Sequence, residues 1–310
     1  MLFSVKHVTW YSYTEMAPFC HNLVHLAPRD TARQTCREHR LTVEPQPASV
    51  ERSTDYFGNW IDFFSVRGGH PSLNVTAQST VELHPPAPPD AAASLPWEEV
   101  VKLNNANLSS DGLSILQLTF PSPRVPRLGA LRVYAEKSFA PRRPIVEAVL
   151  DLNVRIHADF AFDPRSTTIN TTVEELLRIR RGVCQDFAHF TIGCLRAVGL
   201  AARYVSGYIS TIAPPGRPKL VGADASHAWV SVDCGPLGWI DIDPTNNVLV
   251  SDSHISVGWG RDYGDVCPIQ GVFVGKHAMG VNVDVEPLHG NDNAEGQSAH
   301  INLSSTGGGT

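Results

Sequence analysis

Apolar and polar side chains alternate through much of the first 84 residues, a pattern that predicts β-strands with one buried face. The clearest run lies at residues 73–83, with apolar positions at Leu73, Val75, Ala77, Val81 and Leu83. The pair Gly58-Asn59 separates two aromatic dipeptides and predicts a tight hairpin turn between strand ends. We therefore expect several short strands that form a small β-sandwich or partial barrel over residues 1–90.

The run Pro85-Pro86-Ala87-Pro88-Pro89 ends this alternation, and such a stretch is a stiff, extended spacer. We place a domain boundary there and a second domain at residues 91–290. Helical spacing dominates its first half, where Pro144 is expected to be the first residue of a helix. Residues 291–310 are polar and end in glycines, and we expect a disordered tail.

The segment around Cys184 predicts a helix that begins at a thiol. Thr171 and Glu174 resemble a capping box that opens a short helix, which Gly182 is expected to end. A second amphipathic helix then starts at Cys184, with Phe187, Phe190, Cys194 and Val198 on one face. The positive end of a helix favours thiolate over thiol, so Cys184 is a candidate nucleophile.

Three strands are expected after this helix, over residues 202–210, 226–233 and 239–243. Alternation in the last two places His227 and Asp243 on the face opposite the apolar positions. A short hairpin centred on Gly235 would bring them directly opposite each other, about 4.5–5.5 Å apart at Cβ. A register shifted by one pairing unit would bring Asp241 to His227 instead, although Pro244 after the strand favours Asp243.

This combination of residue types predicts nucleophilic catalysis. An imidazolium next to Cys184 would stabilise the thiolate, which attacks an amide carbonyl, and the imidazolium would then protonate the leaving amine. Asp243 would hold the tautomer and the charged form of His227. The backbone N–H of Cys184 is a candidate donor to the oxyanion.

Composition limits the kinds of partner that we expect for this protein. A net charge of −6 argues against a nucleic-acid-binding protein, and no apolar stretch reaches the roughly 20 residues that span a bilayer. The N-terminus lacks a secretory pattern, so we expect a cytoplasmic protein. The six cysteines are scattered, without a CxxC pair. A metal site built from Cys184, His189 and His227 would lack a fourth ligand, and we expect neither a metal nor a cofactor.

Several segments closely resemble the bacterial transglutaminase-like family. In the second domain they are Gly182–His189, Arg203–Tyr208, Ala225–Trp229 and Asp243–Asn247, and elsewhere Leu26–Asp30, Tyr56–Asn59 and Gly260–Val266. The resemblance covers most of residues 1–275, with the motifs in the order of the family. It implies an α+β fold with a papain-like transglutaminase core after a small all-β domain. It also implies a triad of Cys184, His227 and Asp243, which decides the register in favour of Asp243, and no need for calcium.

Three functions remain open at this point. Hydrolysis of a protein or peptide amide is favoured, because water is always present whereas an amine acceptor needs a second binding site. Transfer of the acyl group to an amine, as in a transglutaminase, would use the same catalytic residues. A binding or scaffolding protein that kept the fold without catalysis belongs to another class. Arg261, Asp262 and Tyr263 would serve as a substrate clamp or as a structural ion pair. The sequence does not indicate an oligomeric state.

Overall fold

The computed structural model describes residues 1–210, 225–273 and 276–288, and the expected disordered tail at 291–310 lies outside them. The helices are α1 (Trp97–Ala106), α2 (Ser110–Leu116), α3 (Gly129–Glu136), α4 (Ile145–Asp159), α5 (Val173–Ile179) and α6 (Cys184–Ala197). The strands before α6 are β1 (Leu2–Val24), β2 (Gln34–Glu44), β3 (Val50–Thr54), β4 (Trp60–Leu83), β5 (Ala161–Phe162) and β6 (Arg181–Gly182). The later strands are β7 (Ala202–Ile209), β8 (His227–Asp233), β9 (Trp239–Asp243), β10 (Val248–Leu249), β11 (His254–Gly260), β12 (Ile269–Phe273) and β13 (His277–Pro287).

Two long strands, β1 and β4, form the centre of the first sheet and pair antiparallel over most of their lengths. They contain 23 and 24 residues, so the expectation of several short strands is wrong. Bulges between Ser12 and Phe19 in β1, and Gly68 of β4 at a φ of +92°, let the strands bend without ending. The predicted alternation from Leu73 to Leu83 is confirmed, because its apolar positions are buried.

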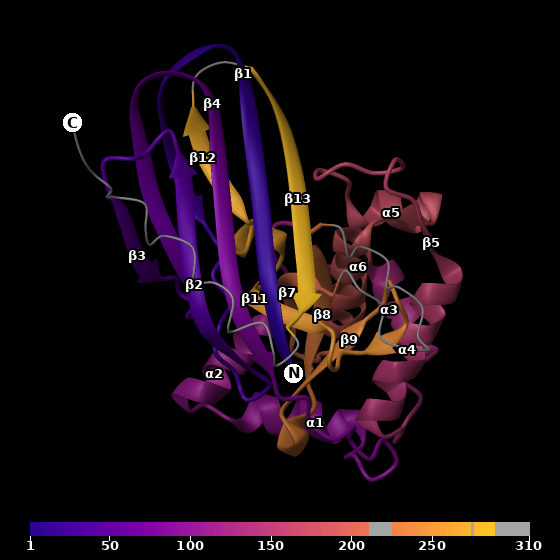
Figure 1. Ribbon diagram of the computed structural model, residues 1–310. Helices are drawn as coiled ribbons and strands as arrows, with labels where there is room; N and C mark the ends of the chain where they lie inside the picture. Colours follow the sequence, from indigo (N-terminus) through magenta and orange to yellow (C-terminus); the bar gives the residue numbers. More distant parts are fainter. Residues whose placement is uncertain (211–224, 274–275, 289–310) are drawn as a thin grey trace, which may run out of the picture.

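The chain returns to this first sheet near its C-terminal end (Figure 1). β13 pairs with the first half of β1, from Phe3 to Tyr13, and β12 pairs with Cys20 to Val24. In Figure 1 the yellow β13 lies beside the indigo β1. Residues 269–287, which the sequence pattern assigned to the second domain, therefore complete the first sheet. The boundary near residue 90 stays a prediction.

The expected turn at Gly58-Asn59 is wider than a two-residue hairpin. Thr54 pairs with Trp60, so Tyr56 and Phe57 belong to the turn and not to strand ends. Oδ1 of Asp55 accepts hydrogen bonds from the backbone N–H groups of Phe57 and Asn59, both at 2.8 Å, and stabilises this longer loop. Gly58 adopts a φ of +72°, which a residue without Cβ allows at little cost.

The second sheet has the order β10-β9-β8-β7-β11, and α6 packs against β7 and β8 on one of its faces. Helices α3 and α4 contact α6 from its other side, so α6 is a buried central layer (Figure 1). The two sheets meet in a shared apolar cluster in which Phe3 and Val5 of β1 pack with Tyr208 and Ile255. No helix in the described ranges is long and apolar enough to cross a bilayer.

Three helix boundaries differ from the sequence patterns. Pro144 is the residue before α4 and not its first residue. The cap of α5 is Thr172 and not Thr171, because Oγ1 of Thr172 accepts the N–H of Glu175 at 3.2 Å. α5 ends at Arg180, which takes the left-handed conformation at a φ of 55°, before Gly182 is reached.

Candidate active site

Cys184 is the first residue of α6, and its partly exposed thiol lies at the N-terminal end of a buried helix. Oδ2 of Asp186 accepts hydrogen bonds from the N–H of Val183 at 2.9 Å and from Oγ1 of Thr167 at 2.7 Å. These bonds fix the turn that leads into the helix. A Cβ at Gly182 would lie 2.7 Å from the same carboxylate oxygen, so the tight turn needs glycine there. Asp186 therefore has a capping role.

The register between β8 and β9 differs from the predicted one. Ser231 pairs with Asp241, so each residue of β8 faces a partner two positions later than expected. The cause is the turn, where the 3₁₀ helix Gly235–Leu237 and a bond from the N–H of Cys234 to the carbonyl of Gly238 make a longer connection. The prediction that Asp243 lies directly opposite His227 is therefore wrong.

A shift of two residues keeps every side chain on its predicted face, and Asp243 reaches His227 diagonally across the ladder. Nε2 of His227 lies 2.9 Å from Oδ2 of Asp243, and both side chains are fully buried. The alternative partner, Asp241, instead accepts a hydrogen bond from Nε1 of Trp229 at 3.3 Å. Asp243 is thus the carboxylate that contacts the histidine.

The second ring nitrogen of His227, Nδ1, is buried and has no hydrogen-bond partner within the described residues. Burial lowers the pKa of His227, but the charge of Asp243, the charge of a Cys184 thiolate and the hydrogen bond to Asp243 raise it above its usual range. The ring therefore lies between a carboxylate on Nε2 and the thiol of Cys184, for which Nδ1 remains available. This arrangement favours an imidazolium–thiolate pair.

Asp243 is held by donors on both of its oxygens. Oδ1 accepts the backbone N–H groups of Thr245 at 2.9 Å and Asn246 at 3.2 Å, and Oδ2 accepts Nδ2 of Asn246 at 2.7 Å. Burial raises the pKa of Asp243, but the charge and hydrogen bond of His227, with a further bond from His254, hold it well below its usual range. Asp243 is therefore an oriented anion at neutral pH.

His254, the first residue of β11, is a site residue that the sequence patterns did not reveal. Its Nε2 lies 3.2 Å from Oδ2 of Asp243, and its side chain is 1% exposed. Burial lowers the pKa of His254 although Asp243 raises it, so a neutral ring donates from Nε2. The signal available in the sequence was the alternation of His254 and Ser256 with Ile255 and Val257, which indicates a strand.

Other residues singled out by the sequence have structural contacts. Nε2 of His189 accepts the backbone N–H of Tyr263 at 3.1 Å, so His189 supports the segment after β11. Arg261 forms a bidentate pair with Asp265 at 2.8 and 2.9 Å, which favours the structural reading of that segment over a clamp. Burial strongly raises the pKa of Cys194, whereas Cys184 is partly exposed.

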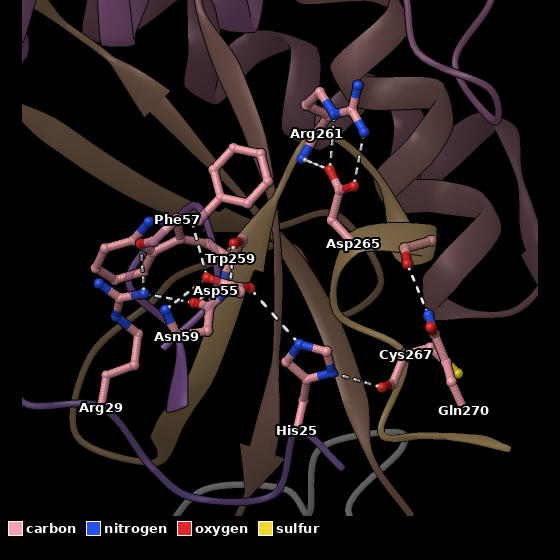
Figure 2. Close-up of polar contacts among 11 residues, drawn as sticks. His25, Arg29, Asp55, Phe57, Asn59, Trp259, Arg261, Asp265, Cys267 and Gln270 are labelled. Atoms are coloured by element: carbon pink, nitrogen blue, oxygen red, sulfur yellow. Dashed lines mark hydrogen bonds and ion pairs between the residues drawn. The ribbon is translucent and has the colours of Figure 1, made fainter. Parts of the chain in front are cut away.

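The N-terminal region holds β11 in place (Figure 2). The side chain of Asn59 bonds both main-chain groups of Trp259: Oδ1 accepts the N–H and Nδ2 donates to the carbonyl, each at 2.9 Å. The guanidinium of Arg29 donates to the carbonyl of Phe57 and to Oδ1 of Asn59, and lies 3.5 Å above the Trp259 ring. Trp259 and His254 share β11, so this junction positions the second histidine of the site.

Three potential metal ligands, on His227, Asp243 and His254, lie within 4.8 Å of one another. Both histidine nitrogens are 2.9 to 3.2 Å from one carboxylate oxygen, which is hydrogen-bond distance. Hydrogen bonds account for the cluster, and we assign no metal to it.

Comparisons with known proteins identify the family of this chain. Residues 3–82 match the model of the bacterial transglutaminase-like N-terminal region, and residues 133–244 match that of the transglutaminase-like superfamily. An uncharacterized protein of Mycobacterium tuberculosis is 42% identical over 298 residues, which cover 93% of each chain. An uncharacterized protein of Mycobacterium leprae is 34% identical over 91% of this chain and 96% of its own length.

The fold also has a solved counterpart. The crystal structure of a "putative cysteine protease" from Cytophaga hutchinsonii matches with a TM-score of 0.72 and 21% identity, over 93% of this chain and 91% of that one. At this identity the match establishes the fold, an all-β N-terminal region followed by a papain-like α+β core. The chain therefore belongs to the transglutaminase-like superfamily, with the N-terminal region found in its bacterial members.

Proposed function

We propose that this protein is a cysteine-dependent enzyme that cleaves amide bonds through a thioester at Cys184. The observation that carries the proposal is the position of His227: one ring nitrogen contacts the buried carboxylate of Asp243, and the other is left for a thiol at the start of a helix. A thiolate, an imidazolium and an orienting carboxylate in series are the requirements of nucleophilic acyl transfer.

In the first half of the reaction, Sγ of Cys184 attacks the amide carbon and forms a C–S bond, and the carbonyl π electrons move to oxygen. The N–H of Cys184 has no acceptor one turn earlier in its helix, so it is available to stabilise this oxyanion. The C–N bond then breaks, and the amine leaves with the proton from His227. Asp243 keeps the histidine oriented throughout.

In the second half, the neutral His227 accepts a proton from water as the water oxygen attacks the thioester carbon. The C–S bond breaks, the carboxylic product leaves, and the thiolate–imidazolium pair is restored. We propose a protein or peptide as the substrate.

Transfer to an amine is the second candidate. A protein-glutamine gamma-glutamyltransferase of Pseudomonas aeruginosa is 33% identical over 135 residues, which cover 42% of this chain but 20% of that protein. Its name supports acyl transfer from glutamine for the shared region. An amine in place of water at the thioester would give that reaction with the same three side chains.

Trapping the thioester tests the proposal. The protein would be incubated with a pool of peptides and glutamine-containing proteins, quenched in acid, and analysed by mass spectrometry for an acyl adduct on Cys184. The adduct should be absent from the Cys184→Ala variant. Incorporation of ¹⁸O from labelled water into the product identifies hydrolysis, and incorporation of a labelled primary amine identifies transfer. A protein that forms no adduct with any member of the pool, and whose Cys184 is no more reactive than its other thiols, would fit the non-catalytic class.

A further inference from the structure

A cavity of about 570 Å³ lies beside the second sheet, where residues 31–34 and the proline-rich segment approach it. Trp239 and Asp241 line it and alternate along β9 with Ile242, and Ile240 also borders it. Arg203 lines it from β7, where it alternates with Ala202 and Tyr204. Ile242, Ala202 and Tyr204 pack in the core around α6. The cavity is therefore on the side of the sheet that faces away from α6. None of the three proposed catalytic residues lines it.

Arg203 of β7 is the central charged group of this cavity. Its guanidinium lies 4.1 Å from the ring centroid of Trp239 and 3.8 Å from that of Trp259. Arg29 lies 3.5 Å from the same Trp259 centroid, so the two cations occupy opposite faces of that indole (Trp259 and Arg29 are drawn in Figure 2). The result is a column in the order Arg29, Trp259, Arg203 and Trp239.

Stacking uses the faces of a guanidinium and leaves its five N–H donors, which lie in the plane, without partners. Nε of Arg203 is buried and makes no hydrogen bond, and the side chain of Arg203 has no hydrogen bond or ion pair with any residue in the described ranges. Burial lowers the pKa of Arg203 to about 10 although the charge of Asp241 raises it. Arg203 as a whole is half-buried, but its buried Nε–H without an acceptor is costly, which points to an acceptor supplied from outside the chain.

The nearest carboxylate is already engaged. Asp241 accepts from Nε1 of Trp229 at 3.3 Å and lies 3.4 Å from Nη1 of Arg33. Arg33 and Asp241 therefore balance each other, and Arg203 leaves one positive charge in excess within the cavity. That balance suits a monoanion better than a dianion such as phosphate.

We propose that this cavity binds a small organic carboxylate, whose two oxygens accept from the N–H groups of Arg203. The apolar body of the ligand would lie against the ring of Trp239 and the side chains of Pro86 and Leu237, which line the same cavity. His254 also lines it, so the ligand would lie next to the histidine that contacts Asp243. The inference is independent of the reaction proposed for Cys184.

Calorimetric titration of the full chain tests the proposal, with benzoate as the probe and benzamide as its neutral isostere. Benzoate should bind saturably and quench tryptophan fluorescence, and its affinity should fall as salt is added. Benzamide should bind roughly tenfold more weakly or worse, because it cannot form charge-assisted bonds. A tripeptide with a free C-terminus, compared with its C-terminal amide, tells whether a peptide end can supply the carboxylate. Equal binding of benzoate and benzamide, tighter binding of inorganic phosphate than of benzoate, or no saturable binding in the millimolar range would overturn the proposal.

Variants separate this cavity from other sites. Arg203→Met should weaken the binding of benzoate roughly tenfold or more. Arg203→Lys keeps the charge but not the two parallel N–H donors of a guanidinium, so its affinity should lie between those of Arg203→Met and the native chain. Arg37→Met is the matched control, because Arg37 is exposed and pairs with Glu82 on the first sheet. Cys184→Ala should bind benzoate as the native chain does. Loss of binding in Cys184→Ala, or native binding in a folded Arg203→Met, would refute the assignment; the comparison of benzoate with benzamide stands even if Arg203→Met does not fold.

Discussion

Nε2 of His254 lies 3.2 Å from Oδ2 of Asp243, the same oxygen that contacts His227 at 2.9 Å. One carboxylate oxygen thus has two histidine partners from different strands. The pKa of His254 is lowered by burial and that of His227 is raised, so the two rings differ in charge at neutral pH. His254 orients the carboxylate, and His227 transfers the proton in the reaction that we propose.

Loss of this contact should reduce the reactivity of Cys184 without abolishing it. We predict that His254→Leu slows alkylation of Cys184 by iodoacetamide at pH 6 roughly tenfold, because Asp243 loses a donor worth about 1.5 kcal/mol. His254→Gln should recover much of the rate, since its amide N–H can occupy the position of Nε2. Equal rates for Leu and Gln variants of equal stability would contradict the orienting role.

Asp243 and Asp241 differ in their contacts, so substitution of each should affect the reactivity of Cys184 differently. Asp243→Asn is expected to slow alkylation of Cys184 at pH 6 by roughly tenfold to a thousandfold, because loss of a close opposite charge moves a pKa by about one to three units. Asp241→Asn should change the rate far less, since Asp241 contacts Trp229 and Arg33 instead of His227. A larger effect at Asp241 would mean that the observed register is not the functional one.

The free energy of unfolding should depend on pH through the contact between Asp243 and His227. The folded pKa of Asp243 lies below its unfolded value of about 3.9, so its contribution is present above that pH and is lost as pH falls through the folded pKa. The folded pKa of His227 lies above its unfolded value of about 6.5, so its contribution is complete below 6.5 and is lost as pH rises through the folded pKa. Both are present between about pH 4 and 6.5.

Urea unfolding of the native chain and Asp243→Asn measures this dependence. The difference in unfolding free energy should be largest near about pH 5.5 and should shrink toward about pH 9.5. Glu51→Gln, which alters an exposed carboxylate on β3, should give a small and constant difference. A difference for Asp243→Asn that grows with pH would contradict the proposed charge states.

The cysteines should differ sharply in reactivity. At pH 6, iodoacetamide is expected to label Cys184 first, because its thiol is partly exposed beside an imidazolium. Cys194 and Cys234 should resist labelling, since burial strongly raises the pKa of both thiols. Peptide mapping by mass spectrometry gives the rate at each site. Uniform, slow labelling would favour a non-catalytic protein.

Asn59 should be a major stabilising residue of the junction. Asn59→Ala leaves the partly buried N–H and carbonyl of Trp259 without partners, and we expect a loss of about 2–4 kcal/mol in unfolding free energy. Asn74→Ala, at an exposed position of β4, is the matched control and should cost much less. The comparison is made by urea denaturation. Similar losses for both variants would show that the Trp259 contacts contribute little.

The sequence predicted the parts of the site that depend on local pattern. A helix beginning at Cys184 follows from glycine, helical spacing and a cap, and the face of Asp243 follows from alternation in its strand. The register did not follow, because it depends on the 3₁₀ turn at Gly235–Leu237, whose length no local pattern sets. The contact between His227 and Asp243 was predicted through a different register, since a slip of two residues preserves the face.

Long-range pairings were beyond the sequence patterns. His254 lies eleven residues after Asp243 and meets it through the pairing of β11 with β7, which alternation along one strand cannot specify. The pairing of β12 and β13 with β1 joins residues more than 240 positions apart. A strand pattern shows which face of a segment is buried but does not identify the partner strand.

Because β12 and β13 return to β1, the papain-like region is an insertion between strands of the first sheet. Both ends of this inserted region continue into strands of the first sheet, so the pairing of those strands fixes the positions of its two ends. A fragment cut at the proline-rich segment would leave β1 without two neighbours and expose unpaired main-chain groups along its edge. Expression of either half by itself should therefore yield aggregation-prone material.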